Sequence, residues 1–137
     1  MSQVIVYKFG GTSLDGANHI ERALQIAGEA LQRDSGVVLV ASAVGATTDT
    51  LQELAVATPN KGTSADAVVT DLIERHRALA RKLLSGSALA GCLTAIDTLG
   101  AELEEQVAAA RSALPALPQR VATILSTGER LSTQLIA

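Results

Sequence analysis

The sequence has few of the residues that several common functions require. Only two of its 137 residues are aromatic, Tyr7 and Phe9, and tryptophan is absent. Fourteen acidic residues outnumber eleven basic ones, so the formal net charge is −3, and the basic residues form no cluster along the chain. Base stacking and tracking of a phosphate backbone therefore lack their usual side chains. The composition argues against nucleic acid as a partner.

Cysteine and long apolar runs are also scarce. Cys92 is the single cysteine, which excludes an internal disulfide framework and fits a reducing compartment. We expect it to behave as a small buried apolar residue. The N-terminus lacks the basic start and apolar segment of a secretory signal, and no run approaches the ~18 apolar residues of a membrane span. These absences favour a cytoplasmic protein that does not engage a membrane.

The residues that are present predict an α/β fold. Hydrophobic residues make up 47% of the chain, enough for one folded domain. Two valine-rich runs, 3–9 and 37–42, are each followed by a glycine-bearing turn and a helical pattern. Because these runs show little polar alternation, they are typical of parallel strands covered on both faces. We expect a three-layer fold, with helices on both faces of a parallel-type sheet and a right-handed crossover between the strands.

Most of the remaining sequence is helical in pattern. The expected segments are a helix from Ile20 to Leu31 ending at Asp34-Ser35-Gly36, a short helix over 48–57, a loop over 58–63, helices over 65–84 and 88–113 separated by Gly86, and a helix from about 119 to Ala137. Polar stretches such as Glu74-Arg75 and Glu102 to Glu105 are expected to be solvated faces. Since the apolar pattern is still in phase at Ala137, we expect a chain cut inside a helix, with a C-terminal half missing.

The stretch "VYKFGGTSL", residues 6–14, has two interpretations. In one, a strand ends at Lys8, and Gly10 and Gly11 let the backbone turn. In the other, the glycines together with Thr12 and Ser13 present N–H groups to phosphate oxygens, and Lys8 adds a compact positive charge. The stretch is neither a Walker P-loop nor a G-x-G-x-x-G fingerprint.

Two further stretches carry candidate ligand-binding residues. In "VASAVGATTDTL", residues 40–51, the hydroxyls near Ser42 and Thr48 could cap a helix or bind a polar ligand at the end of a strand. In "STGERLST", residues 126–133, Ser126 and Glu129 have the S-x-x-E spacing of a capping box. Alternatively, Glu129 holds a substrate ammonium group by a charge-assisted hydrogen bond.

The two histidines, His19 and His76, give no sign of a metal site. They fall on separate helices, with no cysteine or acidic residue at ligand spacing. We interpret both as structural residues at the surface or partly buried. No order of serine, histidine and aspartate suggests a catalytic triad.

Taken together and in this order, the three stretches resemble the amino-acid kinase family and, within it, the aspartokinases. "VYKFGGTSL" is similar to the opening K-F-G-G-T-S signature, "ASAVGATTDTL" to the S-A-x-G-x-T-T-D/N-x-L segment, and "STGERLST" to the G-E-x-x-S segment. The likeness runs from about residue 4 to residue 137. Ala46 departs from it, because many relatives carry lysine at that position.

The resemblance implies transfer of the γ-phosphoryl group of ATP, with Mg²⁺, to the side-chain carboxylate of L-aspartate. The product would be 4-phospho-L-aspartate, on the route to lysine, threonine and methionine. By matching position, Lys8 would be the catalytic residue that contacts the transferring phosphoryl group. The phosphates of ATP would be bound by Lys8, Gly10, Gly11, Thr12 and Ser13.

Matching position also implies that Ser42, Thr48 and Glu129 form the aspartate site, with Glu129 facing the α-amino group. The family's kinase domain is longer than this chain, and regulatory ACT domains usually follow it. Residues 1–137 would then be the N-terminal, substrate-side part of the catalytic domain, with no metal ligand of their own and inactive alone.

Two alternatives stay open. The first is a kinase of the same family with another acceptor, of the glutamate type or a carbamate. The second is a non-catalytic fragment or interaction module that self-associates, suggested by the apolar periodicity that is still running at Ala137. Either a homo-oligomer or association with a complementary second half is expected.

Overall fold

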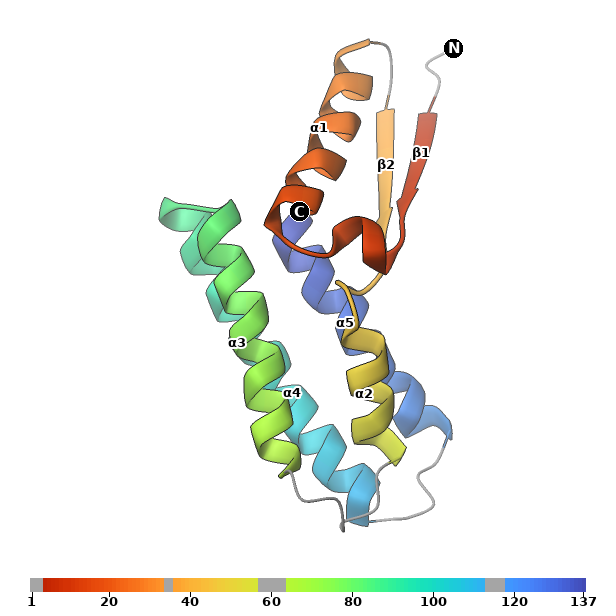
Figure 1. Cartoon of the computed structure of the whole chain (residues 1–137), viewed down its shortest axis with the longest axis vertical. Helices are drawn as coiled ribbons and strands as arrows, with labels where there is room; N and C mark the ends of the chain where they lie inside the picture. The colour runs from red at the N-terminus through yellow and green to blue at the C-terminus, as the bar shows by residue number, and fades with distance from the viewer. Residues whose placement is uncertain (1–3, 34–35, 57–63, 113–117) are drawn as a thin grey trace.

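The predicted order of strands and helices is present in the structure, a computed structural model that describes residues 4–33, 36–56, 64–112 and 118–137 (Figure 1). The elements are β1 (Val4–Phe9), a short 3-10 helix η1 (Gly11–Leu14), α1 (Ala17–Arg33), β2 (Gly36–Ala41), α2 (Thr47–Val56), α3 (Ala65–Leu83), α4 (Gly86–Ser112) and α5 (Pro118–Ile136). The predicted loop at 58–63 and helix end at Asp34-Ser35 fall on residues outside the described ranges.

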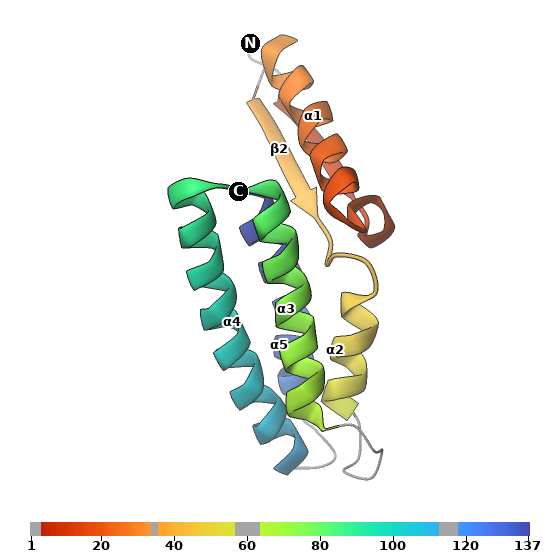
Figure 2. The ribbon, with the colours of Figure 1, turned by 60° about the vertical axis from the view of Figure 1, so that its left-hand side comes forward.

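The two strands pair in parallel, as predicted, from Val4 opposite Gly36 to Phe9 opposite Ala41. Alternate residues of both strands are half-buried, and α1 lies along the sheet (Figures 1 and 2). Because successive side chains point to opposite faces, the intervening residues share the other face.

That other face of the sheet is open within the described residues. Its four valines are 42–62% exposed: Val4, Val6, Val38 and Val40. The expectation of helices on both faces is therefore wrong for this part of the chain, where one layer of helix covers one face. An apolar run shows that a strand favours burial, but it does not show which segment buries it.

The other four helices gather at the carboxyl end of the sheet (Figures 1 and 2). They share an apolar core to which each contributes fully buried side chains, among them Leu51, Leu72, Ile96, Leu103, Ile124 and Leu131. Gly86 has a φ of +58°, a left-handed conformation that suits glycine and separates α3 from α4. Its predicted role between two helices is confirmed.

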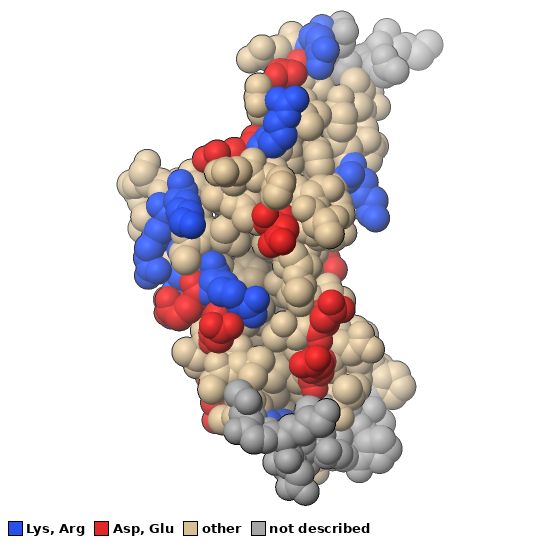
Figure 3. Space-filling model, viewed as in Figure 1, with Lys and Arg blue, Asp and Glu red and all other residues tan. Residues whose placement is uncertain are grey.

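Charged side chains lie on the outer faces of these helices, as expected. Figure 3 shows acidic side chains beside basic ones over the region of α3. Arg77 pairs with Glu74 on its own helix, and its Nη2 lies 2.7 Å from Asp97 Oδ1 on α4. Such exposed pairs contribute about 0–1 kcal/mol each, so the apolar core supplies most of the stability.

Cys92 behaves as the sequence predicts. It is buried on α4, and its Sγ donates a hydrogen bond to the Gln134 carbonyl at 3.2 Å. Burial raises the pKa of this thiol, which keeps it protonated and unreactive.

His76 is more deeply buried than a surface position would allow, since only 2% of it is exposed. Its Nδ1 lies 2.8 Å from the Leu72 carbonyl, which assigns the ring proton to Nδ1 in the neutral form. Its Nε2 is buried with no hydrogen-bond partner. Burial lowers the pKa of His76, and the charge of Arg75 lowers it further, against the opposing effect of the Leu72 hydrogen bond.

This lowered pKa predicts that acid destabilises the fold. The unfolded chain takes up a proton below about pH 6.5, whereas the folded chain resists until its own lower pKa is reached. As the pH is lowered below about 6.5, the free energy of unfolding should therefore decrease. His76 contributes at most about 1.4 kcal/mol per pH unit to this decrease. Urea denaturation over a pH series would measure the slope.

In that experiment the His76→Gln variant should have a flatter slope than the parent protein. The matched variant His19→Gln replaces the exposed histidine of α1 and controls for the loss of an imidazole elsewhere in the fold. Equal slopes in all three proteins would show that His76 does not couple folding to pH.

Candidate functional site

The first two predicted stretches meet where the strands end. Lys8 is the next-to-last residue of β1, opposite Val40, and its exposed side chain shares the open face of the sheet with Val4 and Val6. The Ser42 N–H donates to the Phe9 carbonyl at 3.0 Å, directly after β2. Ser42 is half-buried. The carboxyl ends of β1 and β2 therefore place the segments that carry Lys8 and Ser42 side by side.

The two glycines after Lys8 serve different purposes. Neither has a positive φ, and Gly10 has φ −78° and ψ 169°, which any residue can adopt. A Cβ on Gly10 would meet nothing within 4 Å, whereas one on Gly11 would lie 2.8 Å from the Ala43 carbonyl oxygen. The Gly11 carbonyl also accepts a hydrogen bond from the Gly45 N–H at 3.1 Å. Gly11 is thus required by close contact between the two loops.

The hydroxyl residues of the opening stretch lie in η1, and both are exposed. The Ser13 N–H donates to the Gly10 carbonyl at 3.0 Å, so that donor is engaged inside the loop. In this conformation the Ser13 N–H is therefore not free to bind a phosphate oxygen, the role that the sequence had suggested for it. The hydroxyls of Thr12 and Ser13 remain at the surface as polar groups for an anion.

The second stretch leads into α2. The Ala46 carbonyl accepts a hydrogen bond from the Thr50 N–H at 3.2 Å, which makes Ala46 the N-cap residue. The exposed Thr48 therefore lies inside the first turn rather than at the cap, so the capping interpretation does not describe it. Gly45 has a φ of +52°, and a Cβ there would lie 2.7 Å from Asp15 Oδ1.

In the third stretch the capping-box prediction is wrong. Ser126 lies in the interior of α5, which begins eight residues earlier at Pro118, and its hydroxyl donates to the Thr123 carbonyl at 2.8 Å. Glu129 is therefore not needed to close a helix end. It is exposed on α5, where its carboxylate is open to solvent.

Gly128 brings the turn of α5 that carries Glu129 against the second stretch. A Cβ on Gly128 would lie 2.8 Å from the Cβ of Ala43 and 3.2 Å from Cγ2 of Thr47. Ala43 directly follows Ser42, and Thr47 directly precedes Thr48. The structure thus gathers all three stretches around the loop after β2.

Sequence reasoning missed Ala43 and Gly128 as parts of this site. A signal was present, since glycine is unfavourable inside a helix and usually marks a packing requirement there. That signal marks Gly128 as a close-packed position but does not show which residue packs there, because Ala43 is 85 residues away along the chain.

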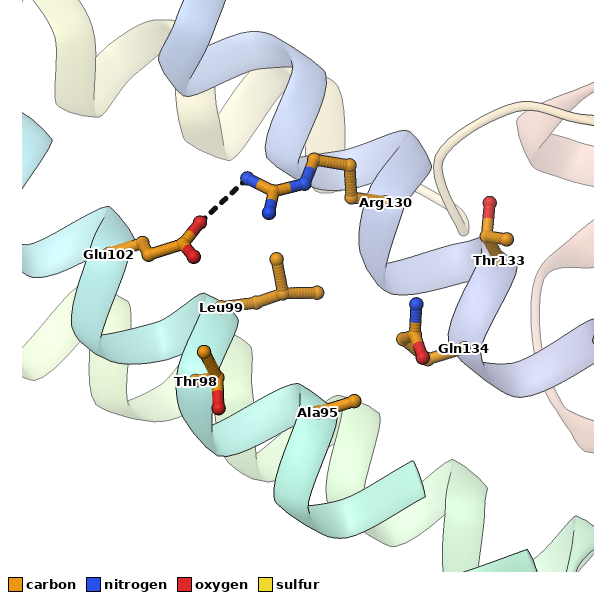
Figure 4. Close-up of a pocket in the computed structure, with 7 residues that line it drawn as sticks. All are labelled: Ala95, Thr98, Leu99, Glu102, Arg130, Thr133 and Gln134. Atoms are coloured by element: carbon orange, nitrogen blue, oxygen red, sulfur yellow. Dashed lines mark hydrogen bonds and ion pairs between the residues drawn. The ribbon is translucent and has the colours of Figure 1, made fainter. Parts of the chain in front are cut away.

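A separate hollow of about 420 Å³ lies between α4 and α5 (Figure 4). Its lining residues are Ala95, Thr98, Leu99, Glu102, Arg130, Thr133 and Gln134. Arg130 and Glu102 form an ion pair of 2.7 Å at one end of it, with Leu99 between the helices (Figure 4). None of the predicted site residues lines this hollow.

Two general properties of the described residues bear on function. Across 4–33, 36–56, 64–112 and 118–137, no helix combines the length and apolar character needed to cross a membrane. In the same ranges, no group of three or more His, Cys, Asp or Glu side chains is placed to hold a metal ion.

Comparison with known proteins assigns the family. The sequence model that describes the amino acid kinase family matches residues 3–137 of this chain. The chain belongs to the amino acid kinase family. This is a family of phosphotransferases that use ATP. The resemblance seen in the three sequence stretches is confirmed at this level.

Solved structures show the same amino acid kinase fold. The chain superimposes on E. coli aspartokinase III in complex with aspartate and ADP (R-state) with a TM-score of 0.78 and 24% identity, covering 98% of this chain and 28% of that one. For the same enzyme in complex with lysine and aspartate (T-state), the TM-score is 0.78 and the identity 25%, covering 97% and 27%. The chain thus spans under a third of these relatives. No curated protein sequence matches it.

Proposed function

We propose that this chain is the N-terminal, substrate-side part of the catalytic domain of an aspartate kinase. That enzyme transfers the γ-phosphoryl group of ATP to the side-chain carboxylate of L-aspartate, giving 4-phospho-L-aspartate. The observation that carries the proposal is that the stretches 6–14, 40–51 and 126–133 meet at the carboxyl ends of the strands. The chain that brings them together belongs to the amino acid kinase family, and its fold matches that of aspartokinase III.

Lys8 supplies the charge on the phosphate side of the proposed site. Its side chain is exposed on the open face of the sheet at the end of β1, and the exposed residues Thr12 and Ser13 follow in η1. Phosphoryl transfer depends mainly on positioning and on neutralising charge at the equatorial oxygens, and a lysine fixed by a strand provides both.

Mg²⁺ accompanies ATP in the proposed reaction. It usually binds phosphates with one or two carboxylates. The described residues fit this only in part, because no group of three or more of their His, Cys, Asp or Glu side chains is placed to hold a metal ion. In the proposal, Lys8 with Thr12 and Ser13 meets the phosphates, and the remaining contacts to nucleotide and metal come from the rest of the domain.

The acceptor side of the proposed site is formed by Ser42, Thr48 and Glu129. The Glu129 carboxylate is free of the capping role that the sequence suggested, so its charge is available for the α-ammonium group of aspartate. The exposed Thr48 hydroxyl and the half-buried Ser42 hydroxyl provide donors for a carboxylate.

Replacing Glu129 with glutamine should raise the KM for aspartate about 10- to 100-fold, since a hydrogen bond to a charged group contributes roughly 1.5–3 kcal/mol. The KM for ATP and the melting temperature should change little, because Glu129 is exposed. The measurement is steady-state ADP release by the full-length kinase that contains this chain. Glu105→Gln, an exposed carboxylate on α4, is the matched control.

The same assay with a panel of acceptors tests the function itself. Aspartate should give the highest kcat/KM, with glutamate and carbamate far lower. A protein that prefers glutamate or carbamate would keep the family and contradict the acceptor proposed here. Unchanged aspartate kinetics in Glu129→Gln, together with a lowered melting temperature, would assign Glu129 a structural role.

A further inference from the structure

Ala43 lies between two glycines that come from opposite ends of the chain. A Cβ on Gly11 would lie 2.8 Å from the carbonyl oxygen of Ala43, and one on Gly128 would lie 2.8 Å from its Cβ. Ala43 is only 2% exposed. The residue after Ser42 is therefore held by η1 through its backbone and by α5 through its methyl group.

Gly128 differs from Gly28 and Gly91, which also lie in helices, and from Gly100 in α4, where an added Cβ would meet only side-chain atoms of Ile73, the nearest at 3.1 Å. It lies in the interior of α5, where glycine is the least favourable residue after proline. A Cβ on Gly28 in α1 or on Gly91 in α4 would meet nothing within 4 Å, so nothing in their surroundings requires glycine. At Gly128 the absence of a Cβ is what lets α5 approach the loop after β2.

From these contacts we infer that Gly11, Ala43 and Gly128, here called the Ala43 clasp, set the spacing of the substrate site. Gly128 and Ala43 act as positioning residues, because they fix the turn that carries Glu129 relative to Ser42. The inference rests on the proposed function for its kinetic consequence. The contact itself depends on geometry alone.

A methyl group at position 128 cannot be accommodated in place. Carbon atoms in contact are normally about 3.5–4.0 Å apart, so a separation of 2.8 Å requires a shift of about 1 Å. The Ala43 Cβ cannot rotate away, whereas Leu51 and Thr47, each 3.2 Å from the same point, make contact through side-chain ends. The shift therefore moves either α5 or the loop after β2, and either movement changes the position of Glu129 relative to Ser42.

Gly128→Ala should lower kcat/KM for aspartate about 100-fold, because a misplacement of about 1 Å has an effect of that size. The KM for ATP should stay within about twofold of the parent. The double variant Ala43→Gly/Gly128→Ala should recover most of the loss, since it removes the methyl group that Gly128→Ala strikes. Gly91→Ala, where the added methyl meets nothing, is the matched control and should behave as the parent does.

Thermal unfolding separates the clasp from the proposed function. Gly128→Ala should lower Tm by about 3–5 °C, and the double variant should regain most of it. If the parent protein does not phosphorylate aspartate, the proposed function fails while this recovery of Tm still supports the clasp. If Gly128→Ala fails to fold, folding of the double variant supports the clasp. A double variant no better than Gly128→Ala, in Tm or in folding, overturns it.

Discussion

Replacing Lys8 with alanine should lower kcat for aspartate phosphorylation about 100-fold or more. Removal of one preorganised group that stabilises transition-state charge typically has an effect of about 3–4 kcal/mol on the barrier. Lys8 is held at the end of β1 with its side chain exposed, so the variant should lose the charge and keep the fold. The KM for aspartate should change less, because the interaction forms with the transferring phosphoryl group.

Two matched variants make the Lys8 experiment decisive. Lys82→Ala removes an exposed lysine at the end of α3 and should leave kcat unchanged. Lys8→Arg keeps the charge but spreads it over a planar group, so its kcat should fall between those of the parent and Lys8→Ala. Near-normal kcat in Lys8→Ala, with ADP release still dependent on aspartate, would remove Lys8 from the mechanism.

The positions of the helices and strands were largely predictable from local pattern. The helix expected over 65–84 is Ala65–Leu83, because its apolar residues recur with the helical period and Gly86 follows it. The two valine-rich runs form the paired parallel strands, and they too were recognised from local pattern, since each is a short apolar run followed by a glycine-bearing turn. Such signals are carried by neighbours in sequence, so no tertiary information is needed to read them.

Two predictions failed because their outcome depends on distant or upstream residues. Ser126 and Glu129 have capping-box spacing, yet α5 already begins at Pro118, which makes Ser126 an interior residue. The valine face of the sheet was expected to be covered, yet Val6 and Val38 are exposed in the described residues. Periodicity identifies a surface that favours burial, and only the tertiary structure identifies what lies against it.

The sequence predicted which residues belong to the candidate site, but it did not predict all the contacts that hold the site together. Lys8, Ser42 and Glu129 came from the order of three motifs, and the structure brings the segments that carry them together around one loop. Their roles stay proposals until the variants are measured. The contacts of Ala43 with Gly11 and Gly128 were missed, since close approach of backbones leaves no signal beyond the glycine itself.

Replacing Gly11 with alanine should destabilise the protein strongly and abolish most of its activity, whereas Gly10→Ala should leave Tm nearly unchanged. The Cβ of Gly11→Ala would lie 2.8 Å from the Ala43 oxygen and 3.1 Å from the Gly45 oxygen. Both are backbone atoms, so one of the two loops must move, with a loss of about 1–3 kcal/mol or more in unfolding free energy. Gly10 has ordinary extended dihedral angles and open space around it.

The comparison of the two glycine variants separates packing from ligand binding. If phosphates approach the backbone at Gly10, Gly10→Ala should raise the KM for ATP while Tm stays near that of the parent, as measured by ADP release and thermal unfolding. Ala43→Gly should rescue Gly128→Ala but not Gly11→Ala, because the Ala43 carbonyl remains when its methyl group is removed. Rescue of both variants, or of neither, would contradict this assignment of contacts, since one glycine meets the backbone of Ala43 and the other its side chain.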